Sequence, residues 1–251
     1  MYESTVNIEK SNQHLLNYVK ARMIPHLNEI DGISTELEDN FRGYFTLACS
    51  DTYRFQVQRC LSNAVTEALS LGYKNVYIRD LLKIDDGDFY RNVLVNTVCI
   101  FDNDYDKQLV SKLVDNTDQM LCLDGYYNFK MASIKRKWQE ISKLVSDNDF
   151  ILSDKELIAE FMQYLLESLV TKESELSLSF ESDDYVLYGK DNRVIGKLQS
   201  LAKVTNCEEE AALNVFCLKP NKVTIYYDVK PSNDFCSLMD KLFYTRYVKV
   251  G

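Results

Sequence analysis

The sequence predicts an α+β fold in which a mostly helical N-terminal region is followed by a smaller region of strands and helices. Apolar residues recur every three or four positions up to about residue 170, as they do on amphipathic helices. Beyond that point, short stretches alternate apolar and polar residues, as half-buried strands do. We therefore predict a helical domain over residues 1–172 and an α+β domain over residues 173–251.

Helices are predicted where a regular apolar stripe follows a capping residue. Asp51 begins one such stripe, and Gly72 is expected to end it. Ser153 and Glu156 form a capping box before another. The expected helical ranges are 7–29, 51–71, 88–101, 104–114, 131–145 and 153–170. On this interpretation, residues 1–115 are all-helical.

Strands are predicted where apolar and polar residues alternate between turn signals. The expected strand ranges are 175–180, 185–188, 193–195, 223–227 and 244–250. Thr205 and Glu208 form the capping box of a helix that ends before Pro220, and Ser232 caps a further helix. Met120–Leu123 fits either a strand or a buried connection, because it is short, apolar and followed by a turn signal.

The core of the helical domain is predicted around Trp138, the only tryptophan of the chain. An apolar stripe with three- and four-residue spacing runs through its helix, and a second stripe follows Ser153. Because the two helices lie one short turn apart, their stripes are expected to share one core. The expected anchors of this core are Trp138, Leu157, Phe161 and Leu165.

Composition and charge exclude several classes of function. The chain has 29 basic and 38 acidic residues, and its net charge of -9 opposes binding to phosphate backbones and anionic lipid. The only histidines are His14 and His26, so histidine-based triads and histidine metal ligands are excluded from residue 27 onward. The glycines are too far apart for a dinucleotide- or phosphate-binding loop. We expect no cofactor.

Cysteine usage and hydropathy indicate the compartment. The seven cysteines are odd in number and form no Cys-x-x-Cys pair, so we expect buried thiols rather than disulfides or zinc ligands. No stretch approaches the roughly 18 apolar residues of a membrane span, and the N-terminus lacks a leader pattern. The sequence predicts a cytoplasmic protein without membrane attachment.

Three alternate carboxylates form a candidate metal site. Asp102, Asp104 and Asp106 could converge on a divalent cation. Together with Asp124, they could also supply the paired carboxylates of a metal-assisted hydrolase or transferase. The alternative is a solvated helix junction in which Asn103 or Asp104 caps the next helix. We favour the junction, because the glycine and glutamate of a calcium loop are missing here.

One concentration of basic residues occurs in this acidic chain, directly after an aromatic segment that contains Tyr126, Tyr127 and Phe129. Its members are Lys130, Lys135, Arg136, Lys137 and Lys143. The simplest interpretation is the polar face of the Trp138 helix. A docking surface for an acidic protein is the second interpretation, and a stacking surface for single-stranded nucleic acid is the third. We expect no nucleic-acid binding at physiological salt.

Four segments of the chain together resemble the YtxC family of sporulation proteins. They are Leu94–Gln108, Asp124–Lys130, Glu160–Leu165 and Leu218–Ile225. Phe129 and Lys130 match the aromatic-basic step that this family has before an amphipathic helix, and Pro220 matches the proline before its final hydrophobic strand. Lys130 replaces a frequent arginine, and Tyr226 and Tyr227 stand where a histidine is expected. The resemblance covers residues 94–247 and implies a cytosolic, sporulation-associated protein of an endospore-forming bacterium with no established enzymatic activity.

These observations favour a non-catalytic protein-binding module whose partner the sequence does not identify. The metal-assisted enzyme centred on Asp102–Asp106 is the first alternative, and the nucleic-acid-binding module that uses Lys130–Lys143 is the second.

Overall fold

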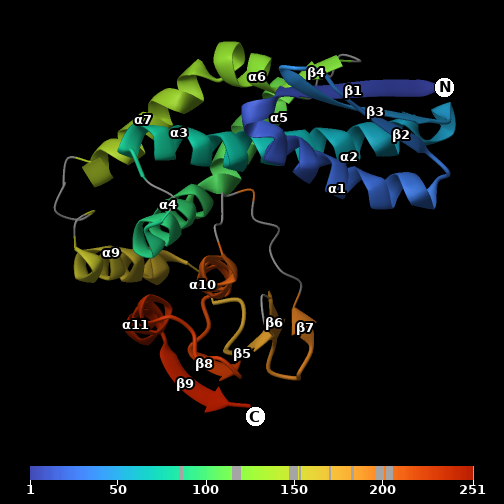
Figure 1. Cartoon of the computed structure of the whole chain (residues 1–251). Coiled ribbons are helices and arrows are strands. Elements are labelled where there is room, and N and C mark those ends of the chain that lie inside the picture. The colour runs from blue at the N-terminus through green and yellow to red at the C-terminus, as the bar shows by residue number, and fades with distance from the viewer. Residues whose placement is uncertain are drawn as a thin grey trace. The chain divides into compact units, whose positions relative to one another are not determined.

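The computed structural model describes residues 1–84, 87–114, 120–146, 152, 154–169, 171–181, 184–195, 201 and 206–250. It shows the α+β fold that the sequence predicts (Figure 1). The chain forms two compact units: the first unit contains residues 1–77 and 102–140, and the second contains residues 78–101 and 141–251. This division differs from the predicted boundary at residue 172.

Two whole helices of the predicted helical domain, α4 (Phe89–Phe101) and α9 (Lys155–Ser168), belong to the second unit. Residues 92–99 of α4 are all buried, so this helix is enclosed on every side over that stretch. It packs against α9, α10 (Cys207–Leu218) and α11 (Asn233–Leu242). A helix that is buried all round must be enclosed by other elements. The middle of the chain therefore supplies the central helix of the second unit.

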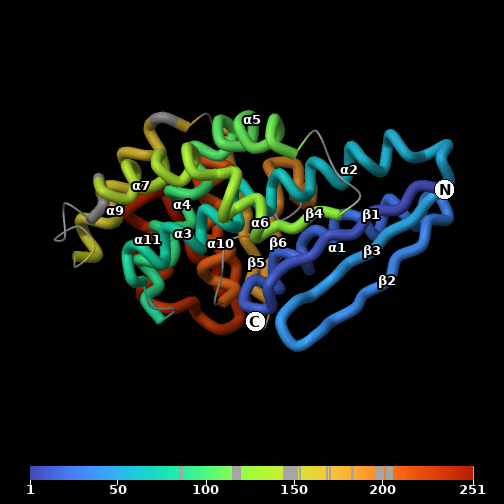
Figure 2. Tube along the Cα trace, turned by 90° about the horizontal axis from the view of Figure 1, so that it is seen from above, coloured from blue at the N-terminus to red at the C-terminus, as the bar shows by residue number. Residues whose placement is uncertain are grey.

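The first unit contains a four-stranded sheet with the order β2-β3-β1-β4. Its strands are β1 (Tyr2–Glu9), β2 (Ile33–Glu38), β3 (Arg42–Cys49) and β4 (Met120–Cys122). β3 runs antiparallel to both β1 and β2, and the short β4 runs parallel to β1. Figure 2 shows the four strands side by side, with β2 at the outer edge.

The prediction that residues 1–115 are all-helical is wrong, because the first 49 residues contain β1, β2 and β3. In β1, alternate residues from Tyr2 to Ile8 are buried, which is the period of a strand with one covered face. Val6 and Ile8 are both fully buried on that face. The sequence prediction assigned Ile8 to the first helix instead, whereas that helix, α1 (Gln13–Glu29), begins five residues later.

Helices cover one face of this sheet. α1 packs against β1, β2 and β3, and α2 (Arg54–Glu67) packs against α1 (Figure 1). Gly72 does not end the second helix, because a π-helical turn over Ala68–Gly72 leads directly into α3 (Tyr73–Leu82). A Cβ at Gly72 would lie 2.3 Å from a methyl carbon of Leu15, so glycine permits the close approach of α1.

The structure describes four further helical elements in the first unit, of which the first and the last were predicted from the sequence. They are α5 (Asn103–Val114), α6 (Leu123–Gly125), a π-helical turn (Tyr126–Lys130) and the first part of α7 (Ala132–Ser146). The predicted break near Asp102 is confirmed, since α4 ends at Phe101 and α5 begins at Asn103. Within the described ranges, no helix is long and apolar enough to cross a membrane.

The second unit contains a five-stranded sheet with the order β7-β6-β5-β8-β9. Its strands are β5 (Glu175–Glu181), β6 (Asp184–Tyr188), β7 (Val194–Ile195), β8 (Lys222–Tyr227) and β9 (Tyr244–Lys249). β5, β8 and β9 run parallel, whereas β6 is antiparallel to β5 and to β7. The predicted strands of this region are therefore confirmed.

The helix caps of the second unit agree only in part with the sequence prediction. Ser232 caps α11 as predicted, because its hydroxyl accepts a hydrogen bond from the Phe235 N–H. Asp154 caps α9, and Asn206 caps α10. The predicted caps Ser153 and Thr205 lie outside the described residues.

The four expected core anchors are divided between the two units. Trp138 is fully buried and belongs to the first unit. Leu157, Phe161 and Leu165 belong to the second unit, where Leu165 is buried and the other two are half-buried. The buried stripe of α9 is rotated from the predicted one, and its members are Ile158, Ala159, Met162, Leu165 and Leu166.

Candidate functional site

Asp106, a member of the predicted metal cluster, is a fully buried counter-ion. One oxygen of its carboxylate accepts hydrogen bonds from the Lys74 ammonium at 2.8 Å and from the Trp138 indole N–H at 2.9 Å. Its other oxygen lies 3.5 Å from the ammonium of Lys137. Lys74 is also fully buried, so this ion pair has no access to solvent. A buried charge of this kind persists only when it is paired and hydrogen-bonded.

The other two carboxylates of the predicted metal cluster have different surroundings. Asp102 pairs with Lys137, whose ammonium also lies 3.8 Å above the ring of Tyr105. Asp104 is exposed in the first turn of α5. The carboxylates of Asp102 and Asp106 therefore converge on lysine ammonium groups. Within the part of the chain that the structure describes, no group of three histidine, cysteine or acidic side chains could hold a metal ion.

The Asp106 cluster joins three helices of the first unit. Lys74 comes from α3, Asp106 from α5, and Trp138 from α7. The ring of Tyr77 contacts Trp138 with centroids 5.9 Å apart. Since every charge in the cluster is matched within the fold, the arrangement stabilises the packing of these helices and offers no open position to a substrate.

Asp124 forms a second buried cluster in the first unit. Its carboxylate accepts hydrogen bonds from the Arg42 guanidinium at 2.8 Å, from the Tyr73 hydroxyl at 2.5 Å and from the Glu9 backbone N–H at 2.8 Å. Burial, followed by the hydrogen bond to Asp124, raises the pKa of Tyr73 above its usual range, so the phenol stays protonated and donates. Arg42 and Tyr73 were not singled out by the sequence. The carboxylate is therefore a structural acceptor.

The second unit has a buried polar network of its own. Arg79 donates to the side-chain oxygen of Asn92 at 2.6 Å, and the amide of Asn92 donates to Glu209 at 2.9 Å. Glu209 is 1% exposed although it lies in the first turn of α10. This acid is therefore structural.

The segment between β4 and α7 places aromatic rings under basic side chains. Tyr127 stacks on Tyr73 with ring centroids 4.4 Å apart, and the Lys135 ammonium lies 4.4 Å above the Tyr127 ring. The Lys130 ammonium lies 4.2 Å above the ring of Tyr126, which is buried. Contacts of this kind hold a cation in position without neutralising its charge.

We define the aromatic–basic surface as Phe129, Lys130, Lys135 and Arg136. The Phe129 side chain is 86% exposed, and Lys130 and Arg136 are exposed. Among the described residues, none of the three cations forms an ion pair. The surface lies at the start of α7, whose opposite face buries Met131, Ile134 and Trp138. The amphipathic helix predicted from that apolar stripe is confirmed.

The five predicted basic residues therefore separate into groups. Lys130, Lys135 and Arg136 belong to the aromatic–basic surface. Lys137 does not, because Asp102 and Asp106 hold its ammonium. Lys143 is exposed near the end of α7, in the part of the helix that belongs to the second unit.

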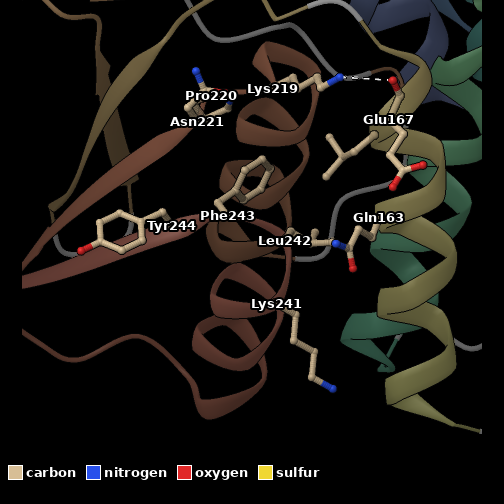
Figure 3. Close-up of a pocket in the computed structure, with 10 residues that line it drawn as sticks. Gln163, Glu167, Lys219, Pro220, Asn221, Lys241, Leu242, Phe243 and Tyr244 are labelled. Carbon is tan, nitrogen blue, oxygen red and sulfur yellow. Dashed lines mark hydrogen bonds between the residues drawn. The ribbon is translucent and has the colours of Figure 1, made fainter.

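The second unit has a shallow cavity of about 490 Å³ between α9, residues 219–221 before β8, and residues 241–244, where α11 leads into β9 (Figure 3). The Lys219 ammonium on its wall donates to the backbone carbonyls of Glu167 and Leu169. The Lys241 ammonium pairs with Glu156 at 2.5 Å. Both cations of the cavity are therefore engaged within the fold, unlike those of the aromatic–basic surface.

No family model, curated protein or solved structure matches the chain.

Proposed function

We propose that the protein is a non-catalytic binding module that recognises an acidic protein segment through the aromatic–basic surface. The observation that carries this proposal is the set of three neighbouring cations that have no carboxylate partner among the described residues, in a chain that has 38 acidic and 29 basic residues. In such a chain, basic side chains have many acids to pair with. Cations that remain unpaired beside one another favour an acidic ligand from outside.

Phe129 supplies the apolar part of the proposed contact. An aromatic side chain that is 86% exposed contributes little to folding, but it can fill a pocket on a partner. The rings of Tyr126 and Tyr127 fix the ammonium groups of Lys130 and Lys135, which lowers the entropy lost when these side chains bind. The surface thus combines an apolar anchor with preorganised positive charge.

The same geometry favours an acidic protein over nucleic acid. Successive bases stack on several bare aromatic faces, whereas Phe129 is the one exposed ring of this segment: Tyr127 is covered by Tyr73 and Lys135, and Tyr126 is buried. The net charge of -9 also opposes a long polyanion more than it opposes a short acidic segment. The resemblance of residues 94–247 to the YtxC family adds a cytosolic, sporulation-associated setting to the proposal.

Fluorescence anisotropy with a labelled synthetic peptide tests this function. The peptide alternates aspartate or glutamate with leucine and phenylalanine, and a second peptide carries asparagine and glutamine in place of the acids. We expect binding of the acidic peptide only, with an affinity that falls as salt screens exposed charges over about 10 Å at 0.1 M. The variant Lys130→Glu/Arg136→Glu should bind about tenfold more weakly, a change of about 1.4 kcal/mol.

A matched control is Arg59→Glu/Lys112→Glu, which reverses two exposed cations elsewhere in the first unit that have no ion pair among the described residues. This control has the same net charge as the test variant and should keep the wild-type affinity within about twofold. An equal loss of peptide affinity in both double variants would show that the effect depends on net charge alone, which would contradict the proposal. Tighter binding of a mixed-sequence single-stranded oligonucleotide than of the acidic peptide would assign the surface to nucleic acid instead.

A further inference from the structure

β2 is an edge strand with an exposed outer side. It lies at the end of the first sheet and pairs only with β3. All six of its residues, from Ile33 to Glu38, are exposed. In the view of Figure 2, no other labelled strand lies beyond it. The outer row of N–H and C=O groups of β2 therefore has no strand partner among the described residues, which is the usual template for pairing with another chain.

This edge lacks the features that normally prevent pairing. The sequence of β2 contains no proline, glycine or lysine, and its register with β3 is unbroken over six residues, so no bulge twists the edge away. Both glutamates of β2 form ion pairs within the same chain: Glu36 pairs with Lys20 at 2.5 Å, and Glu38 pairs with Lys10 at 3.3 Å. The strand is therefore free of bulges, and both of its acids have a basic partner in the same chain.

The face of β2 that points away from α1 is apolar at both ends. Ile33 is 65% exposed and Leu37 is 68% exposed. They point to the same side of the sheet because they are four residues apart, and Thr35 lies between them. In register they face Ala48 and Tyr44 of β3, away from the residues that α1 covers. The edge thus presents two apolar side chains that no described element buries.

The sequence of β2 is complementary to itself in one antiparallel register. When Thr35 faces Thr35 of a second copy, Ile33 faces Leu37 twice, and Ser34 faces Glu36 twice. Shifting the centre of symmetry to Glu36 would place that carboxylate opposite its own copy, and shifting it to Leu37 would place Glu36 opposite Glu38. Like charges directly opposite one another destabilise a strand pair, whereas apolar cross-strand pairs stabilise it.

We propose that the protein forms a two-fold symmetric homodimer in which the β2 strands of two copies pair antiparallel about Thr35. The two four-stranded sheets then become one continuous sheet. A two-fold axis perpendicular to the sheet keeps the open faces of both copies on the same side, so the contacts are self-complementary. This inference is independent of the aromatic–basic surface, because it uses no residue of that surface.

Sedimentation velocity of the full chain tests the dimer. At about 100 µM protein, an interface with micromolar Kd is largely occupied, so we expect a species of twice the 29.2 kDa chain mass. The variant Ile33→Lys/Leu37→Lys should be monomeric, because each introduced lysine faces another lysine across the axis. Both positions are exposed, so the fold should be preserved, and circular dichroism checks this.

The variant Ile33→Glu/Leu37→Lys tests the register itself. In the proposed pairing each introduced glutamate faces an introduced lysine, so this variant should regain the dimer that the double-lysine variant loses. Phe55→Lys, at a 79% exposed position of α2, is the control and should leave the dimer unchanged. A wild-type chain that sediments at 29.2 kDa would overturn the inference. A dimer that persists in Ile33→Lys/Leu37→Lys would place the interface elsewhere and overturn it equally.

Discussion

Arg136 and Lys137 are adjacent on α7 but use their charges in opposite ways. Lys137 turns toward α5, where its ammonium pairs with Asp102 and Asp106. Arg136 is exposed and has no ion pair among the described residues. In the sequence they form part of one basic run, and only the position of acids far away in the chain separates them. A charge matched within the fold stabilises it, whereas an unmatched charge is available to a partner.

The carboxylates of α5 repeat this contrast. Asp106 is fully buried beneath Lys74, Lys137 and Trp138, whereas Asp104, two residues earlier, is exposed. Burying a charged pair gains little over an apolar core, but removing one partner leaves the other charge desolvated and unpaired. The two aspartates should therefore respond very differently to the same small substitution.

The largest expected effect separates these two aspartates. Asp106→Asn removes the counter-ion of the buried Lys74 ammonium and should lower the free energy of unfolding by about 3–5 kcal/mol. Asp104→Asn, at an exposed site of the same helix, should change it by less than about 0.5 kcal/mol. Urea unfolding followed by circular dichroism measures both. Similar losses for the two variants would show that the buried ion pair has no special role.

Trp138 allows packing to be separated from hydrogen bonding within the Asp106 cluster. Trp138→Ala should cost about 3–5 kcal/mol, because a fully buried large side chain is lost. Trp138→Phe keeps most of the ring but removes the donor to Asp106, and should cost about 1.5–3 kcal/mol, the value of a hydrogen bond to a charged group. Equal stability of Trp138→Phe and wild type would show that the indole N–H is dispensable.

The smallest effect concerns Glu67, a half-buried acid on α2. Although burial opposes the shift, hydrogen bonds from Tyr18 and Lys107 hold the pKa of Glu67 below its usual range. Because the pKa of Glu67 is lower in the folded than in the unfolded state, its ionised carboxylate stabilises the fold at pH values above the unfolded pKa of about 4.3. This stabilisation is lost as the pH falls through the folded-state pKa. The difference in Tm between wild type and Glu67→Gln should therefore be largest near neutral pH and shrink on acidification. Glu3→Gln, which removes an exposed carboxylate from β1, is the control and should change Tm little.

Local patterns in the sequence were sufficient for much of the fold. The strands of the second unit, the break at Asp102 and the amphipathic character of α7 all follow from the spacing of neighbouring residues. The strands β1, β2 and β3 were missed. β1 has the polar Ser4 on its buried face, none of the residues of β2 is buried, and in β3 Ala48 adds an apolar residue beside Leu47 and Cys49. Their stability comes from pairing between distant segments, which spacing alone does not reveal.

The candidate site was predicted less completely, for the same reason. The aromatic–basic segment is contiguous, so its composition was visible in the sequence. The partners of its charges were not, because Asp106 lies 32 residues from both Lys74 and Trp138. Arg42, which holds Asp124, lies 82 residues away from it. No local signal marks a lysine that will be buried as a counter-ion.

The most direct test of the account compares Arg136→Met with Lys137→Met in parallel measurements of stability and binding. Both substitutions remove one positive charge and keep an unbranched side chain. Arg136→Met should lower the affinity for the labelled acidic peptide several-fold and leave Tm unchanged, because it removes an exposed and unpaired charge. Lys137→Met should lower Tm and leave peptide affinity unchanged, because it removes a partner of Asp102 and Asp106. Weaker peptide binding in both variants, or a lower Tm in both, would contradict the separation of structural and binding charge on α7.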